Sequence, residues 1–361
     1  MSISVLPPAA LAGLTPEWLS RALSVRHPGT VVAAVELGQA IHGTGTNVPL
    51  RLRYARQGEA GALPERMWLK GGYEAHFETM APSRIYEIEP LFYRELAPRL
   101  DVRVPRCFYA GNDEHRHQGL ALLEDLRVAG ASFGKATLPV SPDVAAGVLA
   151  ALARLHASSW GQSWPQELWY VEKGIPLDGA NAAWYLAQTP QVFERYLAER
   201  AEAAVPACVN DPQRIVRAFW KLAQMSREGV RCLIHSDCHL DNFYFTPDGE
   251  PGLMDWQSPR LGSWAWDVSY FIVSALEIET RRRHERDLLA HYLQALAVHG
   301  VAPPTLDQAW LAYRRYNAYG LFVKIVNPDI FKPREINLAW MSRHVAAAED
   351  LETFDSLEKR A

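Results

Sequence analysis

The sequence predicts an α+β protein whose first part is built mainly on strands and whose second part is mostly helical. Two observations indicate this. Short alternating or apolar runs separated by turns recur up to about residue 126, whereas longer segments with apolar residues at helical spacing dominate afterwards. A chain of 361 residues is long enough for two parts that each bury a hydrophobic core. We therefore expect two domains, an N-terminal one built on strands and a C-terminal one that is mostly helical.

Composition and charge exclude several classes of protein. A hydrophobic content of 48% is typical of a globular chain, and a net charge of −4 provides no general basic field for nucleic acid or an anionic membrane. The 4 cysteines match no disulfide framework, which predicts a reducing, cytoplasmic location. The N-terminus lacks a basic segment followed by a long apolar stretch, so we expect neither a signal peptide nor a membrane span.

A helix and two strands open the N-terminal part. Thr15 followed by Pro16 predicts a helix start, because a hydroxyl caps free amides and proline is tolerated where no amide is needed. Strands are expected over Thr30–Leu37 and Val48–Ala55. The second of them alternates apolar and charged residues, as a half-buried strand does.

The glycine-rich segment that joins these two strands contains Gly43, Gly45 and Thr46. Because glycine permits close backbone approach and unusual dihedral angles, such a hairpin can lay amides over a triphosphate. The segment matches neither the P-loop pattern nor the dinucleotide-binding pattern. At this point an ordinary turn between strands remains an alternative.

Three further strands are expected over Met67–Lys70, Cys107–Ala110 and Gly119–Leu123. Beyond them the chain turns helical, and Ser141 followed by Pro142 predicts a helix start. The expected buried face of this helix consists of Val144, Val148, Leu152 and Leu155.

Two other features of the helical part have simple structural interpretations. His156, at the end of the helix that follows Ser141, is expected to be a packed residue and not a catalytic one. The basic run Arg281–Arg286 precedes apolar residues at helical spacing, which predicts the solvated face of a helix.

One short segment carries most of the chemistry. His235, Asp237 and Asn242 follow a buried strand, and Asp255 follows a hairpin with a Pro-Asp-Gly turn, so these side chains are expected at one edge of the structure. Phosphoryl transfer from ATP requires such a set: a carboxylate that orients the attacking hydroxyl, and an amide plus a second carboxylate that hold Mg²⁺. The pattern predicts a phosphotransferase that depends on ATP and Mg²⁺.

Cys238 and His239, beside His235 and Asp241, raise the alternative of a zinc site. Zinc sites normally draw their ligands from paired and spaced motifs, which the sequence does not contain. We expect His239 to lie near the phosphates or to be a packed polar group. Asp241 is expected to be a hydrogen-bonding turn residue.

The segment resembles the catalytic and metal loops of the aminoglycoside phosphotransferase and choline kinase superfamily, distant relatives of protein kinases. The resemblance implies that Asp237 is the catalytic base and that His235 braces its loop. It further implies that Asn242 and Asp255 hold Mg²⁺, and that Asp267 ties the loop to the following helix. It also implies a bilobal protein-kinase-like fold, with a five-stranded antiparallel sheet and one main helix in the N-terminal lobe and a mostly helical C-terminal lobe.

Upstream, the resemblance assigns further residues to ATP binding. Lys70 would neutralise phosphate charge and Glu89, in a Glu-x-x-Phe-Tyr phrase, would form an ion pair with it. Pro90 departs from a regular helix, so the helix either begins near Glu89 or kinks there, and Glu87 is the reserve partner of Lys70.

The glycine-rich hairpin and a hinge complete the implied nucleotide site. The resemblance places Gly43, Gly45 and Thr46 over the phosphates. It places the backbone of Glu124 and Leu126 at the edge of the adenine ring. The hinge implies a lobe boundary there, with an N-terminal nucleotide-binding lobe over 1–126 and a C-terminal lobe over 127–361.

Substrate identity is less determined. Tryptophans are frequent in the helical part, namely Trp160, Trp164, Trp169, Trp184, Trp264, Trp266, Trp310 and Trp340. They favour a large and substantially apolar acceptor alcohol. The acids near the C-terminus are interleaved with Lys359 and Arg360 and form no unopposed acidic patch, which favours a neutral or anionic acceptor. The sequence around Asp267 is closest to the ecdysteroid-kinase-like and uncharacterised bacterial phosphotransferase branch. A hydroxyacyl-CoA kinase and an aminoglycoside or choline kinase are alternatives, as are a nucleotide-binding pseudokinase and a metal-dependent hydrolase.

Overall fold

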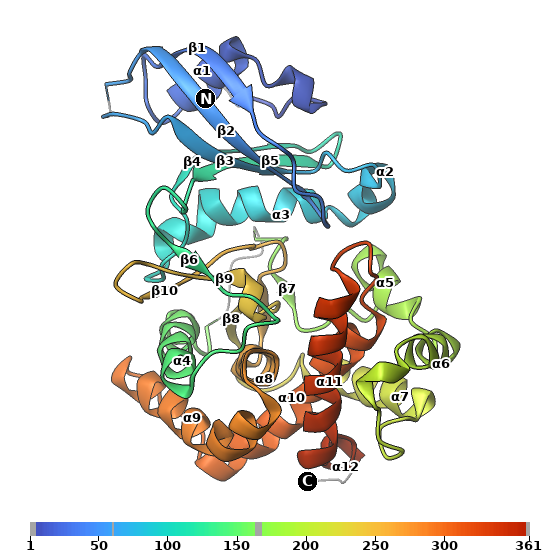
Figure 1. Ribbon diagram of the computed structural model, residues 1–361. Coiled ribbons are helices and arrows are strands. Elements are labelled where there is room, and N and C mark those ends of the chain that lie inside the picture. The colour runs from blue at the N-terminus through green and yellow to red at the C-terminus, as the bar shows by residue number, and fades with distance from the viewer. Residues whose placement is uncertain (1–4, 60, 163–167, 359–361) are drawn as a thin grey trace. The chain divides into compact units, whose positions relative to one another are not determined.

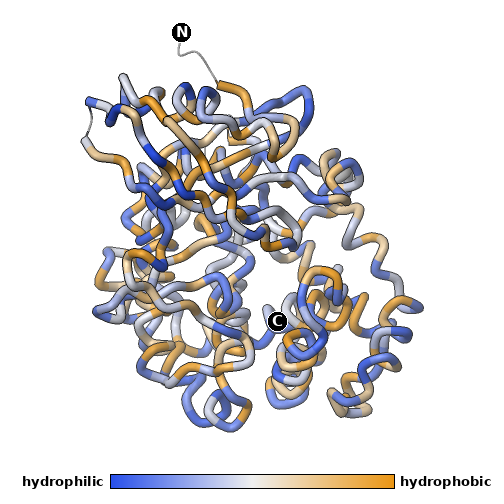
Figure 2. Tube along the Cα trace, turned by 45° about the horizontal axis from the view of Figure 1, so that its top comes forward, coloured by the Kyte–Doolittle hydropathy of each residue, from blue (hydrophilic) through white to orange (hydrophobic). Residues whose placement is uncertain are grey.

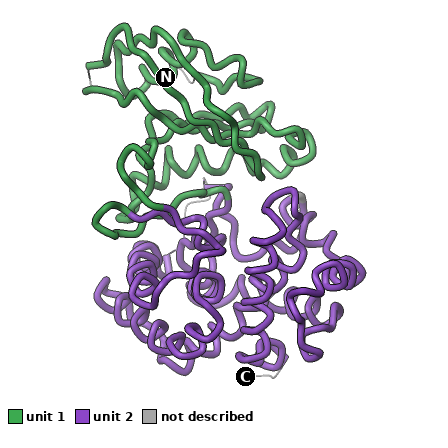
Figure 3. Tube along the Cα trace, in the orientation of Figure 1, with its two compact units in different colours: residues 1–132, 246–257 green, residues 133–245, 258–361 purple. Residues whose placement is uncertain are grey.

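The structure is a computed structural model that describes residues 5–59, 61–162 and 168–358 (Figure 1). The chain forms two compact units (Figure 3). Unit 1 consists of residues 1–132 and 246–257, and unit 2 consists of residues 133–245 and 258–361. Strands and helices are both abundant, which confirms the α+β class. The functional division after residue 126 stays a prediction.

Unit 1 contains the five-stranded antiparallel sheet that the sequence predicts, in the order β1-β2-β3-β5-β4. Its strands are β1 (Val31–Leu37), β2 (Thr46–Arg56), β3 (Arg66–Gly71), β4 (Cys107–Asp113) and β5 (Gln118–Glu124). Along β2, Leu50 and Leu52 are buried whereas Arg51 and Arg53 are exposed, because successive side chains of a strand point to opposite faces. One face of the sheet therefore lies on a hydrophobic core.

Helix α1 (Pro16–Ser24) packs into that core. Its start is as predicted, since the Thr15 hydroxyl accepts a hydrogen bond of 3.2 Å from the Trp18 amide and Pro16 occupies the first helical position. The other short elements of unit 1 are η1 (Leu11–Gly13), α2 (Phe77–Met80), η2 (Ala81–Ser83), η4 (Ala97–Arg99) and β10 (Pro251–Leu253).

Helix α3 (Ile85–Leu91) runs through Pro90 and continues as a π-helical turn, η3 (Phe92–Leu96). The helix therefore starts before Glu89, and its irregularity takes the form of the π turn. Pro90 has no amide to offer the Tyr86 carbonyl one turn earlier. A Cβ at Gly119 of β5 would collide with that carbonyl oxygen, so only glycine lets the sheet approach the helix this closely.

Unit 2 is mostly helical (Figure 1). Its α-helices are α4 (Pro142–Ala157), α5 (Ala183–Leu186), α6 (Pro190–Glu199), α7 (Pro212–Met225), α8 (Trp264–Ala275), α9 (Ile278–Val298), α10 (Leu306–Val326), α11 (Arg334–Asp350) and α12 (Thr353–Glu358). Its short elements are β7 (Glu172–Lys173), η5 (Ala180–Ala182), η6 (Ala201–Ala203), β8 (Cys232–Ile234), η7 (Leu240–Asn242), β9 (Phe243–Phe245) and β11 (Arg260–Gly262), and β6 (Ser132–Phe133) spans the passage from unit 1 to unit 2.

Helix α8 forms the centre of unit 2, because all of its residues are buried and it contacts α4, α9, α10 and α11. A small sheet in the order β7-β11-β8 presents the end of β8 next to this helix. The predicted strand before His235 is thus confirmed as β8. Hydrophobic and hydrophilic residues alternate along the chain in both units, as Figure 2 shows.

Two predictions about helix faces are wrong in part. In α4 the residues Val148, Leu152 and Leu155 are buried as expected, but Val144 in the first turn is 39% exposed. In α9 the basic run is not uniformly solvated, because Arg281 is only 1% exposed. Arg281 forms ion pairs with Glu285 on the same helix and with Asp350 on α11, and these two carboxylates stabilise its buried guanidinium.

Two predictions from composition can be compared with the described residues. All four cysteines are free thiols, which agrees with the absence of a disulfide framework. Within the ranges that the structure describes, no helix has the length and apolar character needed to cross a membrane.

The predicted turn between β9 and β10 is closed by the Gly249 amide, which donates to the Thr246 carbonyl at 2.8 Å.

Candidate active site

In unit 1, Lys70 at the end of β3 forms ion pairs with two carboxylates. Its ammonium lies 2.7 Å from Glu89 Oε2 and 2.8 Å from Asp255 Oδ1. The predicted ion pair between Lys70 and Glu89 is thus confirmed. Burial lowers the pKa of Lys70, but the carboxylates of Asp255 and Glu89 outweigh it and raise that pKa above its usual value. Lys70 is therefore a fixed positive charge, suited to an anionic ligand.

Glu87, the reserve partner of Lys70, is directed elsewhere. Its carboxylate forms ion pairs with Arg84 at 2.8 Å and with His117 at 2.9 Å. The Asn112 side chain also donates to the Glu87 carbonyl at 2.9 Å. These contacts leave Glu89 as the glutamate that pairs with Lys70.

The segment around Asp255 is fixed from two sides. The Trp256 amide donates to Glu89 Oε1 at 3.2 Å, and the Trp256 indole stacks on Phe92 with ring centroids 3.9 Å apart. Asp255 itself has a φ of 66°, a left-handed conformation that aspartate tolerates better than most residues. The carboxylate of Asp255 is therefore held in a defined position within unit 1.

The glycine-rich hairpin is fastened to the segment that follows β3. The Thr46 hydroxyl donates to Glu74 at 2.7 Å, and Tyr86 donates to the Thr44 carbonyl at 3.1 Å. Thr46 is fully buried, so a nucleotide would meet the hairpin through its backbone and not through this hydroxyl. Gly43 and Gly45 lie in the half-buried bend beside it, with no left-handed φ.

The predicted hinge lies at the end of β5. The Glu124 amide donates to the Arg106 carbonyl at 2.8 Å, and the Leu126 carbonyl accepts from Ala131 at 3.0 Å. These bonds occupy one backbone group of each residue. Contacts with an adenine edge would therefore fall to the remaining backbone groups of Glu124 and Leu126.

In unit 2, the loop after β8 presents Asp237 together with Asn242. The Asn242 side-chain amide donates to the Asp237 carbonyl at 2.8 Å and to Asp237 Oδ2 at 3.2 Å. Tyr270 donates to the other carboxylate oxygen at 3.3 Å, and His239 Nε2 lies 3.4 Å from Oδ2. Both amide protons of Asn242 thus face Asp237, and its side-chain oxygen is a ligand type that suits Mg²⁺.

The electrostatic surroundings keep Asp237 ionised. Burial raises its pKa, but the interaction and hydrogen bond with His239 and the positive charge of Lys324 outweigh this and lower the pKa well below the usual range. A carboxylate at neutral pH can accept a hydrogen bond from an alcohol and orient it for attack.

Asp267 on α8 ties this loop to the helix, as the sequence predicted. It is fully buried and accepts hydrogen bonds from the amides of His235 at 2.7 Å and Ser236 at 2.8 Å. His156 Nε2 lies 3.2 Å from the same carboxylate and its Nδ1 lies 2.7 Å from the Tyr292 hydroxyl. The prediction that His156 is a packed residue is confirmed.

Replacing Asp267 with alanine is expected to destabilise unit 2 strongly. The substitution leaves the buried amides of His235 and Ser236 without their acceptor, which should lower the free energy of unfolding by about 3 kcal/mol. Urea denaturation followed by circular dichroism measures this loss. Asp287→Ala, at an exposed position of α9, is the control and should change stability by less than about 0.5 kcal/mol. An equal effect of both substitutions would contradict the assigned role of Asp267.

The residues of the zinc alternative make other contacts. Cys238 is fully buried, and His239 packs on Trp340 with ring centroids 4.7 Å apart. Asp241 accepts from the Ala136 amide at 2.6 Å and pairs with Lys332 at 3.2 Å, which confirms it as a hydrogen-bonding turn residue. Among the described residues, no three histidine, cysteine or acidic side chains come together as a metal site would require.

Sequence reasoning missed two residues next to Asp237. Tyr270 follows Asp267 by one helical turn, and this spacing could have indicated that both face the loop. Lys324 stands alone in the apolar end of α10 and is 5% exposed. A single lysine in an apolar helical run is a weak signal of a buried charge, and the sequence does not indicate what it faces.

The fold is that of the protein-kinase-like class, and the family to which the chain is matched defines a phosphotransferase that uses an alcohol as acceptor. The chain belongs to the ecdysteroid kinase-like family, whose model matches residues 48–300. No curated protein sequence matches the chain.

Several solved structures are similar to this chain at low sequence identity. A spectinomycin phosphotransferase in complex with ADP and spectinomycin is 14% identical, with a TM-score of 0.50, over 94% of this chain and 99% of that chain. A choline kinase from Streptococcus pneumoniae is 14% identical, with a TM-score of 0.46, over 89% of this chain and 94% of that chain. An ethanolamine kinase from Plasmodium vivax is 13% identical, with a TM-score of 0.46, over 87% of this chain and 81% of that chain.

Proposed function

We propose that the protein is a kinase that transfers the γ-phosphoryl group of Mg²⁺-ATP to a hydroxyl of a largely apolar alcohol. The observation that carries this proposal is the ion pair of Lys70 with Glu89, shared with Asp255. A strand lysine paired with a helix glutamate is the arrangement that kinases use to hold phosphates. The oxygen ligands expected for Mg²⁺ are Asp255 and Asn242.

Each residue has a defined part in the proposed reaction. Lys70 neutralises phosphate charge, and the backbone of the hairpin around Gly43 and Gly45 covers the phosphates. Asp237 accepts a hydrogen bond from the acceptor hydroxyl and orients its oxygen toward the γ-phosphorus. Asp255 and Asn242 would hold a Mg²⁺ ion, which would supply positive charge for the phosphate oxygens. His235 and Asp267 keep the Asp237 loop in place.

The charges near the C-terminus support a neutral or anionic acceptor. Glu352 pairs with Arg314, and Asp355 and Glu358 both pair with Arg214. Acids that are already neutralised cannot attract several ammonium groups. This part of the chain therefore offers no unopposed acidic patch for an aminoglycoside.

The tryptophans divide into core residues and candidates for acceptor contact. Trp266 and Trp340 are fully buried, whereas Trp169 is 40% exposed. Trp164 lies outside the described residues. Aromatic side chains that keep an accessible face suit an apolar ligand, and they support the proposal of an apolar acceptor.

A screen of hydroxylated compounds for acceptor-dependent ADP formation tests the proposed function. The panel should include sterols and hydroxyacyl-CoAs, the two apolar classes, together with kanamycin and choline. ADP formation that depends on an added alcohol supports the kinase. ATP binding without turnover would indicate a pseudokinase, and phosphate release from esters without ATP would indicate a hydrolase.

The acceptor itself should show apolar recognition in steady-state kinetics. We expect the acceptor KM to change little between low and moderate ionic strength, because salt screens only charge attraction. Each buried CH₂ removed from the acceptor should cost about 0.8 kcal/mol of binding. A steep salt dependence with kanamycin-like or choline-like acceptors would contradict an apolar acceptor.

A further inference from the structure

A buried lysine lies next to the Asp237 loop of unit 2. Lys324, in the last turn of α10, is 5% exposed. No hydrogen bond or ion pair joins its ammonium to another group in the part of the chain that the structure describes. Instead, the ammonium lies 3.8 Å from the ring centre of Trp340 and 5.0 Å from that of Tyr270. The hydroxyl of the same Tyr270 contacts Asp237.

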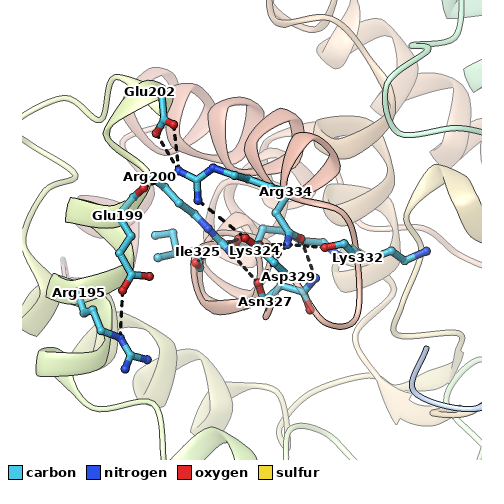
Figure 4. A network of polar contacts seen from close by, with 11 residues as sticks. Arg195, Glu199, Arg200, Glu202, Lys324, Ile325, Asn327, Asp329, Lys332 and Arg334 are labelled. Atoms are coloured by element: carbon cyan, nitrogen blue, oxygen red, sulfur yellow. Dashed lines mark hydrogen bonds and ion pairs between the residues drawn. The ribbon is translucent and has the colours of Figure 1, made fainter. Parts of the chain in front are cut away.

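The end of α10 that carries Lys324 is held in place by a buried arginine. Arg200, which is 1% exposed, donates to the carbonyls of Ile325 and Asn327, each at 2.7 Å. It also pairs with Asp329 at 2.6 Å (Figure 4). Because the last carbonyls of a helix need donors, Arg200 fixes the helix end. The position of Lys324 is therefore built into the fold.

A second cation lies on the same aromatic surface. Lys332 is 5.8 Å from the ring centre of Trp340 and pairs with Asp241 at 3.2 Å. Figure 4 shows Lys332 on the segment that follows α10, beside the network around Arg200. Two ammonium groups, those of Lys324 and Lys332, thus lie on Trp340, and the carboxylates of Asp237 and Asp241 lie near them.

The protonated ammonium of Lys324 can donate hydrogen bonds to an anion, and it occupies the aromatic faces that a cationic ligand would need. Burial lowers the pKa of Lys324 to about 8, although the Asp237 carboxylate opposes this shift, so the group remains mostly protonated at neutral pH. A buried ammonium is stabilised when its N–H donors meet an anion. A ligand cation would seek the faces of Tyr270 and Trp340, which Lys324 already occupies.

We propose that Lys324 determines acceptor specificity: its ammonium binds an anionic group of the acceptor alcohol, a carboxylate or a phosphate, and excludes cationic acceptors. This inference rests on the proposed function, in which Asp237 faces the acceptor hydroxyl. It narrows the acceptor from a neutral or anionic apolar alcohol to an apolar alcohol that carries negative charge.

Calorimetric titration with four matched probes tests the proposal without requiring turnover. The probes are dodecanols whose far end carries a carboxylate, a phosphate, a hydroxyl or a trimethylammonium group. The wild-type protein should bind one of the two anionic probes at least about tenfold more tightly than the trimethylammonium probe. Comparison of the carboxylate with the phosphate shows which anion the site takes.

Three variants connect the preference to Lys324. Lys324→Met keeps the length of the side chain without its charge and should abolish the preference for the anionic probes. Lys324→Arg should retain it. Lys221→Met, at an exposed position of α7, is the matched control and should bind all four probes as the wild type does. The melting temperature of Lys324→Met should not fall, because the substitution removes a buried charge.

The outcomes separate this proposal from the proposed function. Three results would each overturn the role of Lys324. The wild type could bind the trimethylammonium probe as tightly as the anionic probes or more tightly, or it could fail to bind the anionic probes. Lys324→Met could also show the same preference as the wild type. Mg²⁺-ATP binding and ADP formation are measured on the same preparation. A Lys324-dependent anion preference without any ADP formation would refute the kinase and leave the anion site standing.

Discussion

Asp237→Asn is expected to bind ATP like the wild type and to lose turnover by about 10²–10⁴-fold or more. The side chain keeps its size, but an amide cannot accept the proton of the acceptor alcohol. Lys70, Glu89 and Asp255 belong to unit 1 and are unchanged, so nucleotide affinity should persist. Acceptor-dependent ADP formation measures the turnover, and calorimetry measures the affinity for ATP.

Asp287→Asn provides the control for this substitution. Asp287 is exposed on α9, and the same chemical change there should leave the rate unaltered. A wild-type rate in Asp237→Asn would remove Asp237 from the proposed mechanism. A loss of ATP affinity equal to the loss of rate would indicate that the substitution disturbs more than the acceptor.

Asp255→Ala is expected to abolish the Mg²⁺ dependence of nucleotide binding. Among the proposed ligands, Asp255 supplies the only carboxylate, and a carboxylate is needed to bridge the metal to the phosphates. Lys70 keeps its ion pair with Glu89 at 2.7 Å, so the unit should remain folded. Calorimetry with ATP in the presence and absence of Mg²⁺ measures the effect.

Two further variants interpret the result at Asp255. Asp255→Asn retains a residue type that accepts the left-handed conformation at φ 66°, and it separates the loss of charge from backbone strain. Asp248→Ala, at an exposed turn position in the same unit, should bind Mg²⁺-ATP normally. Unchanged Mg²⁺-ATP affinity in Asp255→Ala would contradict its role as a metal ligand.

Local sequence patterns were sufficient for much of the fold. The strands of the five-stranded sheet and the start of α1 were predicted because alternation and capping are properties of neighbouring residues. The contacts of Asp267 with the His235 loop were expected through a family resemblance carried by a short motif. The functional roles of the site residues remain proposals.

Contacts between distant segments that no family motif indicates could not be predicted. The choice between Glu89 and Glu87 depends on how α3 continues past Pro90, and on the fact that His117 of another segment takes Glu87. Arg281 is buried because Asp350 from α11 reaches it. Lys324 and Tyr270 meet only because α8 and α10 pack together. Helical periodicity identifies the buried face of a helix but not its partner.

The discontinuity of unit 1 affects how the protein is made. Residues 246–257, which carry Asp255 and Trp256, complete a unit whose other residues end at 132. A ribosome must therefore synthesise 133–245 before the sheet unit receives its last segment. Until then Lys70 has only Glu89 as a carboxylate partner, and the Phe92 ring lacks the indole that stacks on it. Domains usually fold as units during synthesis, beginning with the N-terminal one. Here unit 1 emerges first from the ribosome, but its folding cannot be completed until residues 246–257 have been synthesised.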